Sequence, residues 1–476
     1  MTAVRLADFV KAYDVRGLVP EQLSPEVAAA LGSAFAQVVV LPEGESGVVV
    51  GHDMRASSPG LSQAFAAGVA AHGVDVTTIG LCSTDGLYYA SGSLGLAGAM
   101  FTASHNPAAY NGIKLCRSAA RPVGQDSGLA EVRDLAQWLL DRGPQHAALH
   151  AGRPGTVTAR DVLADYAAYL RSLVDLRGGR HLTVVVDAGN GMAGLTVPAV
   201  LQGGDLPLTV VPLYFELDGT FPNHEANPLE PENLRDLQAA VLAQGADLGI
   251  AFDGDADRCF VVDERGEPVS PSAITALVAE REVAKEVAAG RPAGEVSVVH
   301  NLITSRTVPE TIASLGARAV RTRVGHSYVK AQMAEHEAVF GGEHSAHYYF
   351  RDFWYADTGM LAALHVLAAL GEQAGPMSGL VGRFERYVAS GELNSRVEDV
   401  PGAVGRVRDW ALARGASADT LDGLTMTRED EPTWWFSLRS SNTEPLLRLN
   451  VEAEDRSTME QVRDAVLGLV RQEAPA

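Results

Sequence analysis

Residues 182–194 read LTVVVDAGNGMAG, in which a run of β-branched residues leads through an aspartate into a glycine-rich turn. The apolar run predicts a buried strand, and an amphipathic helical pattern follows the glycines. The same order recurs after Val48-Val-Val-Gly-His-Asp53 and after Val296-Ser-Val-Val-His-Asn301. Continuous apolar strands that alternate with helices are typical of α/β layers whose sheet is covered on both faces. The sequence therefore predicts three α/β domains in series.

The C-terminal segment has a different pattern. Apolar runs at Trp434–Leu438 and Leu446–Glu452 predict a strand pair around a polar loop. Ser457-Thr-Met-Glu460 then predicts a capping box that begins a helix, so we expect a smaller α+β domain. Clusters of Gly, Pro and Ser mark the boundaries between domains. We expect four domains, at residues 1–155, 156–262, 263–378 and 379–476.

The composition indicates a folded protein with an acidic surface. The 476 residues include 38 Lys and Arg against 59 Asp and Glu, which gives a formal net charge of −21, and 46% of them are apolar. This charge repels nucleic acids and anionic lipids at long range, so we expect neither as a partner. An anionic small ligand would therefore need a local basic pocket.

The cysteines and the N-terminus favour a cytoplasmic protein. The three cysteines are scattered and form no CxxC pair, which argues against a disulfide framework or a structural zinc site. Charges at Arg5, Asp8 and Lys11 interrupt the apolar run that a signal peptide needs. Residues 86–113 contain no Asp, Glu, Lys or Arg, but Gly, Ser, Asn and Pro punctuate them. We expect a buried strand followed by a loop there, and no membrane span.

An acidic motif, Asp253-Gly-Asp-Ala-Asp-Arg258, lies between the apolar runs Leu248–Phe252 and Cys259–Val262, so we expect a tight loop between two strands. Carboxylates at i, i+2 and i+4 point the same way on an extended backbone. Three converging carboxylates repel one another unless a hard cation such as Mg²⁺ neutralises them. A solvated acidic turn is the other interpretation. An EF-hand is excluded, because Arg258 stands where that calcium loop needs Gly.

The loop Thr102-Ala-Ser104-His-Asn-Pro107 follows a buried run and leads to Tyr110-Asn-Gly-Ile-Lys114. A serine in such a loop is commonly a turn residue or a helix cap. No Gly-x-Ser-x-Gly motif surrounds it, so we expect no acyl-transfer nucleophile. A phosphorylated serine could instead complete the oxygen cage of the acidic loop, because phosphoryl transfer depends on positioning and charge neutralisation.

Two further loops carry groups that suit a sugar phosphate. Glu343, Ser345 and His347 alternate along the chain, so an extended segment would present a carboxylate, a hydroxyl and an imidazole on one face. Arg439-Ser-Ser-Asn-Thr-Glu-Pro445 offers a guanidinium, short hydroxyls and loop amides, which are the groups of a phosphate site. A hydrogen-bonded strand end and an ordinary surface turn explain the same segments without a ligand.

The glycines of residues 189–194 also match the dinucleotide-binding pattern GxGxxG. Glu216 lies 22 residues beyond the last glycine, close to the spacing of such sites. Pro212 interrupts the intervening apolar run, which argues against a central strand there. On these local grounds a dinucleotide site stays an alternative.

Four loops in this order together resemble the α-D-phosphohexomutase superfamily, and most closely the bacterial phosphomannomutase/phosphoglucomutase enzymes: TASHNP at 102–107, DGDADR at 253–258, GEHSAH at 342–347 and RSSNTEP at 439–445. The resemblance covers essentially the whole chain and extends to YDVRG at 13–17, GHDMRASS at 51–58 and DGTFPNH at 218–224. It implies three similar mixed-sheet α/β domains and a smaller C-terminal α+β domain around a central cleft. It also implies that residues 189–194 are only a strand-to-helix turn.

The resemblance implies a phosphoryl-transfer reaction. Ser104 is similar to the family's phosphoserine, and Asp253, Asp255 and Asp257 are similar to the Mg²⁺ ligands that share the metal with its phosphate. The phosphoryl group would pass to a hexose monophosphate, and the resulting 1,6-bisphosphate would turn around and return its other phosphoryl group to the serine. Glucose or mannose 1,6-bisphosphate is the implied activator. Arg258, together with Mg²⁺, would neutralise the transferring group.

The remaining groups follow from the same resemblance. Candidates for proton handling or positioning, which the sequence does not rank, are Arg16, Lys114, His326 and His347. Glu343 and Ser345 would bind the sugar hydroxyls. The phosphate that does not react would be bound by Arg439, Ser441, Asn442 and Thr443.

Within this family we expect a phosphomannomutase that interconverts mannose 1-phosphate and mannose 6-phosphate, also accepts glucose phosphates, and is a monomer or a homodimer. His344 stands where phosphoglucosamine mutases usually have Gln, which disfavours the amino sugar. Ala346 and Ile303 depart from relatives, which commonly have Gly and Lys there. The alternatives are a phosphoglucomutase, a bisphosphate synthase, and a non-catalytic phosphosugar-binding protein. The intact Ser104 and loop aspartates argue against the last.

Overall fold

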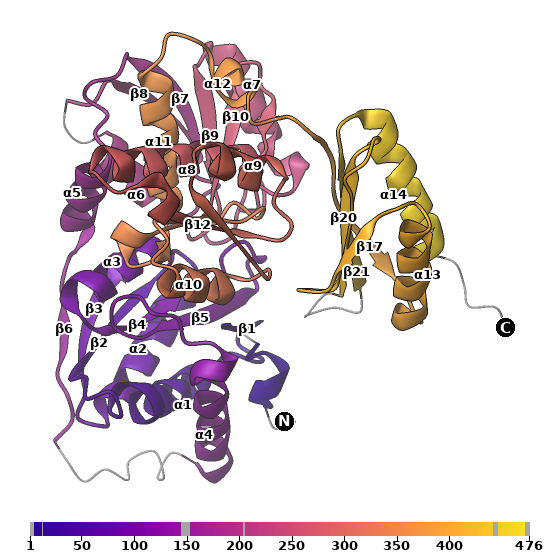
Figure 1. The fold of residues 1–476 in the computed structure, drawn as a ribbon. Coiled ribbons are helices and arrows are strands. Elements are labelled where there is room, and N and C mark those ends of the chain that lie inside the picture. Colours follow the sequence, from indigo (N-terminus) through magenta and orange to yellow (C-terminus); the bar gives the residue numbers. More distant parts are fainter. Residues whose placement is uncertain (1–3, 12, 144–152, 203–204, 441–445, 472–476) are drawn as a thin grey trace. The chain divides into compact units, whose positions relative to one another are not determined.

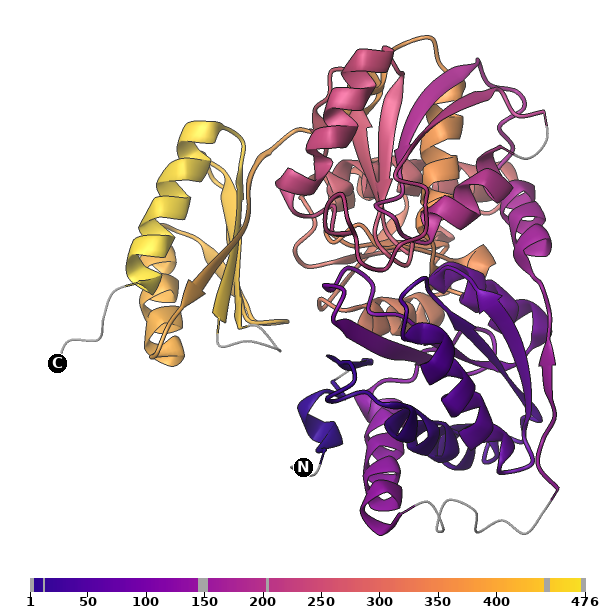
Figure 2. The same cartoon turned by 180° about the vertical axis from the view of Figure 1, so that it is seen from behind.

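The structure is a computed structural model that describes residues 4–11, 13–143, 153–202, 205–440 and 446–471 (Figures 1 and 2). The chain divides into two compact units, each made of two stretches of sequence. Unit 1 comprises Met1–Val269 and Ser345–Leu380, and unit 2 comprises Ser270–His344 and Val381–Ala476.

The first sheet, in unit 1, has six strands in the order β1-β5-β4-β2-β3-β6. Their bounds are Val15–Leu18 (β1), Gly47–His52 (β2), Asp75–Leu81 (β3), Ala97–Phe101 (β4), Tyr110–Cys116 (β5) and Val157–Ala159 (β6). Strand β2 pairs in parallel with β3 and β4, whereas β5 pairs antiparallel with β4 and β1, so the sheet is mixed. The predicted strand at Val48–Val50 is confirmed as the buried part of β2.

Helices cover both faces of this sheet. They are α1 (Pro25–Phe35), α2 (Ser58–Ala70), α3 (Thr84–Leu94) and α4 (Leu129–Arg142). Val48 and Val50 pack into the core that contains residues of α1, α2 and α4, whereas Val49 packs with Leu87 and Ala90 of α3 on the opposite face. Because successive side chains of a strand alternate between faces, a run of valines that is buried throughout requires a helical layer on each side.

The charge-free segment 86–113 corrects one expectation. Its first part continues helix α3, and only then come β4 and a loop, so the expected strand was wrong for residues 86–94. The helix begins where Ser83 caps it by accepting a hydrogen bond from the Gly86 amide, and it ends at Gly95, whose φ is 65°. Among the described residues, no helix is long and apolar enough to cross a bilayer.

The second sheet, also in unit 1, has the order β11-β10-β9-β7-β8. Its strands are β7 (Leu182–Asp187), β8 (Leu208–Leu213), β9 (Leu248–Phe252), β10 (Cys259–Asp263) and β11 (Pro268–Val269), and the helices of this region are α5 (Leu163–Leu173), α6 (Ala193–Leu201) and α7 (Arg235–Gln244). Pro212 lies in the edge strand β8, the position that a proline tolerates. The glycine-rich turn leads from β7 into α6, as the resemblance implied.

The third sheet contains β12 (Ser297–Asn301), β13 (Arg318–Thr322), β14 (Phe340–Gly342), β15 (Tyr348–Phe350) and β16 (Ala356–Asp357), with helices α8 (Pro271–Ala288), α9 (Thr307–Ser314), α10 (His326–Glu335) and α11 (Gly359–Gly371). In unit 2, β12 pairs in parallel with β13 and β14. In unit 1, β15 and β16 are antiparallel. This sheet is therefore mixed, like the other two.

The C-terminal domain, in unit 2, has an all-antiparallel sheet in the order β17-β21-β20-β19-β18. Its strands are β17 (Val388–Arg396), β18 (Ser417–Asp419), β19 (Leu424–Arg428), β20 (Trp434–Ser440) and β21 (Leu446–Ala453); α13 (Val400–Leu412) and α14 (Arg456–Val470) pack on them, and the short α12 (Met377–Val381) precedes them. The predicted strand pair and the smaller α+β domain are confirmed. The predicted capping box is wrong, because Asp455 caps α14 by accepting a hydrogen bond of 2.9 Å from the Thr458 amide.

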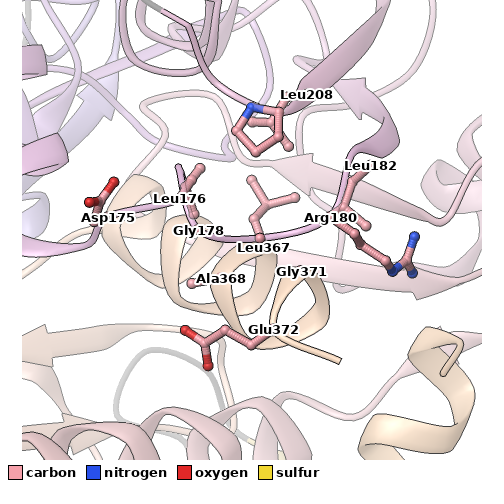
Figure 3. Close-up of a pocket in the computed structure, with 12 residues that line it drawn as sticks. Asp175, Leu176, Gly178, Arg180, Leu182, Leu208, Leu367, Ala368, Gly371 and Glu372 are labelled. Atoms are coloured by element: carbon pink, nitrogen blue, oxygen red, sulfur yellow. The ribbon is translucent and has the colours of Figure 1, made fainter. Parts of the chain in front are cut away.

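Figure 3 shows a pocket of about 110 Å³ in unit 1, where the segment before β7 meets the C-terminal part of α11. Aliphatic side chains such as Leu176, Leu182 and Leu367 line it, and it contains none of the site residues expected from the sequence. Beside the pocket, the backbones of the two segments lie close together, and the Arg180 amide donates a hydrogen bond of 2.8 Å to the Gly371 carbonyl. The pocket is a packing feature between two segments of unit 1.

Candidate active site

The acidic loop connects two adjacent antiparallel strands. Phe252 at the end of β9 pairs with Cys259 at the start of β10, so residues 253–258 form the tight loop that the sequence predicted. Asp253, Asp255 and Asp257 are all buried. One oxygen atom of each carboxylate lies within 4.8 Å of the others. The structure thus brings the three predicted carboxylates together inside the protein, and the solvated-turn interpretation is wrong.

Ser104 lies in the loop between β4 and β5, at this cluster. Its Oγ donates a hydrogen bond of 2.7 Å to Asp253 Oδ2. Its backbone has a φ of 49°, the left-handed region that non-glycine residues rarely adopt. A Cβ atom on Gly254 would stand only 2.5 Å from the Ser104 carbonyl oxygen, so the acidic loop approaches the serine backbone closely because residue 254 is glycine.

Two cations, the buried Arg258 and the half-buried Lys114, balance the carboxylates. Arg258 Nε lies 2.9 Å from Asp253 Oδ2. Lys114 of β5 places Nζ at 2.7 Å from Asp255 Oδ2 and 2.5 Å from Asp257 Oδ2. The structure therefore gathers Lys114 and Arg258, two of the residues that the resemblance singled out, at the carboxylates.

The charges shift the protonation equilibria of the cluster. Burial, opposed by Arg258 and reinforced by the neighbouring carboxylates, raises the pKa of Asp253 to about 7. Burial acts in the same direction on Asp255, but Lys114 outweighs it and holds the pKa of that carboxyl below its usual range. Burial disfavours the Lys114 ammonium, yet Asp255 and Asp257 raise its pKa well above the usual value. Lys114 is thus a fixed positive charge, and the pKa values of Asp253 and Asp255 are shifted in opposite directions.

The donor set fits a hard divalent cation. Asp255 Oδ1 and Asp257 Oδ1 are buried and accept no hydrogen bond from the described part of the chain. A buried carboxylate oxygen without a donor is costly unless a cation faces it. Mg²⁺ prefers oxygen ligands and is commonly bound by a few carboxylates together with a phosphate. These residues are therefore suited to hold Mg²⁺.

The neighbouring His105 acts as a hydrogen-bond acceptor. Its Nδ1 lies 2.6 Å from Arg258 Nη2 and 3.1 Å from Ser104 Oγ. Burial, together with the charges of Arg258 and Arg16, lowers the pKa of His105 well below its usual value. A neutral imidazole accepts the Arg258 proton, which leaves the Ser104 hydroxyl to donate to Asp253.

Arg16 and His347 also lie in unit 1. Arg16 of β1 pairs with Asp14 and donates a hydrogen bond of 2.6 Å to Asn106 in the loop between β4 and β5, residues 102–109, which we call the serine loop. His347 Nδ1 lies 3.1 Å from Asp357 Oδ2 and 3.9 Å from Asp257 Oδ1. A carboxylate on one ring nitrogen orients the imidazole and fixes its tautomer. Asp357, a buried aspartate, thus orients the ring of His347, one of the residues proposed for proton handling.

The predicted sugar-binding residues lie near the end of β14. In unit 2, Glu343 is buried, and its Oε1 accepts hydrogen bonds from Asn301 Nδ2 at 3.0 Å and from the Gly325 amide at 3.2 Å. His326 begins helix α10 directly after that glycine. In unit 1, Ser345 is half-buried and precedes Ala346, whose φ is 64°. Within unit 2, the hydrogen bond from Gly325 therefore links Glu343 to the residue that precedes His326.

Arg439 lies on β20 of unit 2 with its side chain only 9% exposed. Its guanidinium lies 3.6 Å from Asp422 and 3.9 Å from Glu392. Burial lowers the pKa of Arg439, and the two carboxylates oppose that shift. The other residues predicted for this loop, Ser441, Asn442 and Thr443, lie outside the described residues.

Three residues at the site were not expected from the sequence. Asp357 contacts His347, and Thr84 Oγ1 donates a hydrogen bond of 2.6 Å to Asp255 Oδ2. Asp85, the neighbour of Thr84 in α3, accepts hydrogen bonds from the hydroxyls of Tyr166 and Thr358, each at 2.7 Å. Burial raises the pKa of Asp85 to about 6. The sequence separations of these contacts, up to 273 residues, leave no local pattern by which they could have been found.

The fold and the geometry together define a class of protein: an enzyme with three mixed-sheet α/β domains, an antiparallel C-terminal domain, and a buried serine beside a carboxylate cluster suited to a cation. The sequence matches the family described as phosphoglucomutase/phosphomannomutase over four consecutive parts. These are the alpha/beta/alpha domain I at residues 8–137, domain II at 164–266, domain III at 270–387, and the C-terminal domain at 392–469.

Individual relatives agree with this match. A Xanthomonas campestris protein named "Phosphohexose mutases" is 40% identical over 465 residues, which are 97% of this chain and 98% of the relative. An Escherichia coli phosphomannomutase is 36% identical over 468 residues, again 97% of this chain and 98% of the relative. The crystal structure of a phosphoglucomutase/phosphomannomutase family protein from Burkholderia thailandensis is 30% identical, with a TM-score of 0.84 and coverage of 98% of both chains.

The chain therefore belongs to the phosphoglucomutase/phosphomannomutase family, within the α-D-phosphohexomutase superfamily. It is a phosphohexomutase, that is, an isomerase of hexose phosphates. The match also explains the GxGxxG pattern as the turn between β7 and α6, so a dinucleotide site is not required there.

Proposed function

We propose that the protein is a Mg²⁺-dependent phosphomannomutase that uses Ser104 as its phosphoryl carrier. The observation that carries this proposal is the 2.7 Å hydrogen bond from Ser104 Oγ to Asp253, at a cluster of three buried carboxylates. A serine in this position already points at the carboxylates that would hold the cation needed to neutralise a phosphate placed on it. Phosphoryl transfer needs such positioning and charge balance more than it needs a strong base.

The neighbouring side chains would each have a distinct task. Asp253, Asp255 and Asp257 would hold Mg²⁺ together with the phosphate of Ser104, and the metal would supply positive charge for the transferring group. Arg258, anchored on Asp253, would add a second positive charge. Lys114, paired with Asp255 and Asp257, holds these carboxylates in place.

The sugar hydroxyl must lose a proton when it accepts the phosphoryl group. His347 is our candidate acceptor, because Asp357 orients its ring and would stabilise the imidazolium that results. Arg16 contacts the serine loop through Asn106 and would position the phosphate. His326 stays a second candidate for proton handling. Glu343 and Ser345 would bind the sugar hydroxyls.

The reaction would proceed in two transfers. Ser104 would donate its phosphoryl group to a hexose monophosphate, and the hexose 1,6-bisphosphate would turn around and return the other phosphoryl group to the same oxygen. Arg439 would bind the phosphate that does not react at each stage, together with Ser441, Asn442 and Thr443. Glucose or mannose 1,6-bisphosphate would activate enzyme molecules that have lost their phosphate.

The first test concerns the carrier. Peptide mapping of freshly purified protein should place a phosphoryl group on Ser104. Ser104→Ala should remove most turnover and leave the affinity for hexose phosphates nearly intact, because the hydroxyl supplies chemistry more than binding. Isothermal titration with mannose 1-phosphate would measure that affinity. Phosphate found only on other residues would contradict the mechanism.

The second test concerns the substrate. The name phosphomannomutase of several relatives supports mannose phosphates as the first substrates of this chain. The Burkholderia protein belongs to a phosphoglucomutase/phosphomannomutase family, so we expect glucose phosphates as second substrates. In a coupled assay with a trace of glucose 1,6-bisphosphate, kcat/KM should be highest or equal highest for mannose 1-phosphate, lower for glucose 1-phosphate and negligible for glucosamine 1-phosphate. A preference for the amino sugar would contradict the interpretation of His344.

A further inference from the structure

Two motifs named above, GHDMRASS at 51–58 and DGTFPNH at 218–224, have no part in the proposed chemistry. Both belong to unit 1, and they meet at one side chain, that of Arg55. This arginine is among the largest fully buried side chains of the protein, with its side chain 1% exposed. A buried guanidinium is costly unless every donor is satisfied, so its partners indicate its role.

Most partners of Arg55 are backbone carbonyls of the serine loop and of Tyr110, the strand residue that follows it. Nη2 donates to the carbonyl oxygens of Ser104, at 3.0 Å, and Asn106, at 2.7 Å. Nη1 donates to those of Pro107, at 2.9 Å, and Tyr110, at 3.0 Å. Nε completes the set with a contact of 3.2 Å to Asp53 Oδ2. The five N–H donors of an arginine thus have five acceptors, three of them in the loop that carries Ser104 and a fourth at Tyr110, the first residue of β5.

The arginine is itself held in place. Asp53 is buried; its Oδ1 accepts hydrogen bonds from the Arg55 amide at 3.0 Å and from the Ser58 hydroxyl at 2.6 Å. Asn111, just after the loop, donates to the hydroxyls of Ser57 and Ser58 at 2.8 Å each. The segment 53–58 and both ends of the serine loop therefore form one hydrogen-bonded assembly.

The second motif encloses the guanidinium. The Phe221 ring lies over it, with Arg55 Cζ 5.1 Å from the ring centroid. A Cβ atom on Gly219 would stand 2.7 Å from Arg55 Cα, so the 218–221 loop fits against the arginine backbone only because residue 219 is glycine. An aromatic face over a desolvated guanidinium is favourable, and it keeps water from competing for the carbonyls.

The backbone conformation of Ser104 is strained and requires contacts that hold it in place. Its φ of 49° is unfavourable for a residue with a Cβ atom, and such a conformation persists only when the surroundings determine it. Besides Arg55, the Ser104 amide donates a hydrogen bond of 2.9 Å to Thr102 Oγ1. Loss of the Arg55 contacts would let the loop relax toward ordinary backbone angles and move Oγ away from Asp253.

We propose that Arg55 is a positioning residue for the phosphoryl-transfer reaction: it fixes the strained backbone of Ser104 through the carbonyls of the serine loop, and Phe221 shields it. This inference rests on the proposed role of Ser104 as phosphoryl carrier. It assigns Arg55 no contact with the substrate. Its removal therefore affects the rate of transfer and leaves the binding of hexose phosphate intact.

The experiment compares Arg55→Lys with Arg171→Lys. Lysine has three donors on a point charge and cannot match the planar set of five. Arg171 is a matched control, because its Nη1 also donates to two backbone carbonyls, those of Ala199 and Val200, at 2.6 and 3.3 Å, away from the candidate site. The readouts are kcat and KM on glucose 1-phosphate, the single-turnover rate of Ser104 phosphorylation by glucose 1,6-bisphosphate, and hydrogen exchange of the amides of residues 104–112.

For Arg55→Lys we expect kcat and the phosphorylation rate to fall on the order of 10²-fold, since small misplacements of a reacting group have effects of that size, with KM unchanged. Amide hydrogen exchange in the serine loop should become faster. Arg171→Lys should leave kcat, the phosphorylation rate and this exchange unchanged. Equal phosphorylation rates in the two folded variants would overturn the inference. Absence of phosphate on Ser104 in the unsubstituted protein would instead overturn the proposed function.

A second variant guards against misfolding. Phe221→Leu keeps all five hydrogen-bond acceptors and removes only the ring above the guanidinium. We expect a several-fold lower kcat and faster exchange in residues 104–110, in the same direction as Arg55→Lys. Should Arg55→Lys fail to fold, an unchanged kcat and unchanged exchange in Phe221→Leu overturn the inference.

Discussion

Single residues at the candidate site adopt backbone conformations that their side chains disfavour. Ser104, Ala256 and Ala346 have φ values of 49°, 59° and 64°, and each lies in a different one of the loops that the sequence singled out. Such strain costs about 1–3 kcal/mol per residue and persists where the surrounding contacts hold the loop. For Ser104 those contacts come from Arg55 and Thr102. These three residues of left-handed backbone thus lie in loops that the proposed chemistry uses.

Ala346 gives a test at this scale, because its left-handed backbone favours glycine. Ala346→Gly should raise the free energy of unfolding by up to about 1 kcal/mol, since relief of the left-handed strain outweighs the greater freedom of the unfolded chain. Urea unfolding followed by circular dichroism measures this change.

The matched control for that substitution is Ala239→Gly, in the interior of α7 on an exposed site, where glycine should lower the stability by about 1 kcal/mol. If both substitutions destabilise the protein equally, the φ of Ala346 is not a source of strain.

At the scale of elements, the sequence predicted what local patterns determine. The runs of valine became β2, β7 and β12, and the apolar runs around the acidic loop became β9 and β10. Element ends were less predictable: Asp455 caps α14 in place of the expected Ser457, and α3 occupies part of a segment read as strand. The cap of α14 was misplaced because neighbouring polar residues can each cap a helix. The start of segment 86–113 was misread because its small residues suit a helix or a strand.

The first turn of helix α3 contacts the acidic loop. The sequence could not predict this contact, because Thr84 and Asp255 are 171 residues apart. Thr84 donates its hydroxyl proton to Asp255 at 2.6 Å, and its amide donates to the Asp255 carbonyl at 3.0 Å. Partners of metal-binding carboxylates orient them, and their loss commonly weakens metal binding. The N-terminus of α3 therefore fixes one of the proposed Mg²⁺ ligands.

We predict that Thr84→Val, which keeps the shape and removes the hydroxyl, weakens Mg²⁺ binding by about 10- to 100-fold. Calorimetric titration with Mg²⁺ measures this directly and does not depend on turnover. Thr84→Ser retains the donor and should stay close to the unsubstituted protein. Equal Mg²⁺ affinities for the valine and serine variants would show that the hydroxyl plays no part in orienting Asp255.

At the scale of the whole molecule, the order of the chain and the compact units do not coincide. The sequence pattern predicted successive domains, and the family matches are successive as well, yet unit 1 takes in Ser345–Leu380 from far along the chain. Local periodicity cannot reveal this, because it depends on which surfaces meet after folding. Helix α11 lies in that stretch, and all thirteen of its residues are buried.

The burial of α11 has a consequence for folding. A helix that is apolar all round must be covered on every side, and the segments that cover it leave apolar surface exposed when it is absent. Within unit 1, Gly359 at its start packs against the Arg258 backbone, where a Cβ atom would stand 2.7 Å away, and Gly371 at its end accepts the Arg180 amide. Thr358 adds the hydrogen bond to Asp85. The stretch thus supports both the acidic loop and the core of the second sheet.

We therefore predict that the fragment Met1–Val269 does not fold cooperatively, whereas the same fragment joined to Ser345–Leu380 by a Gly/Ser linker does. Thermal unfolding followed by near-ultraviolet circular dichroism should show a sharp transition only for the fusion, and the shorter fragment should bind a dye for exposed apolar surface. The control is a fusion of the same length in which Leu361, Leu364 and Leu367 are replaced by Asp, which removes the apolar contacts and keeps the chain connected. A cooperative transition in Met1–Val269 at the temperature of the fusion would mean that α11 covers unit 1 without stabilising it.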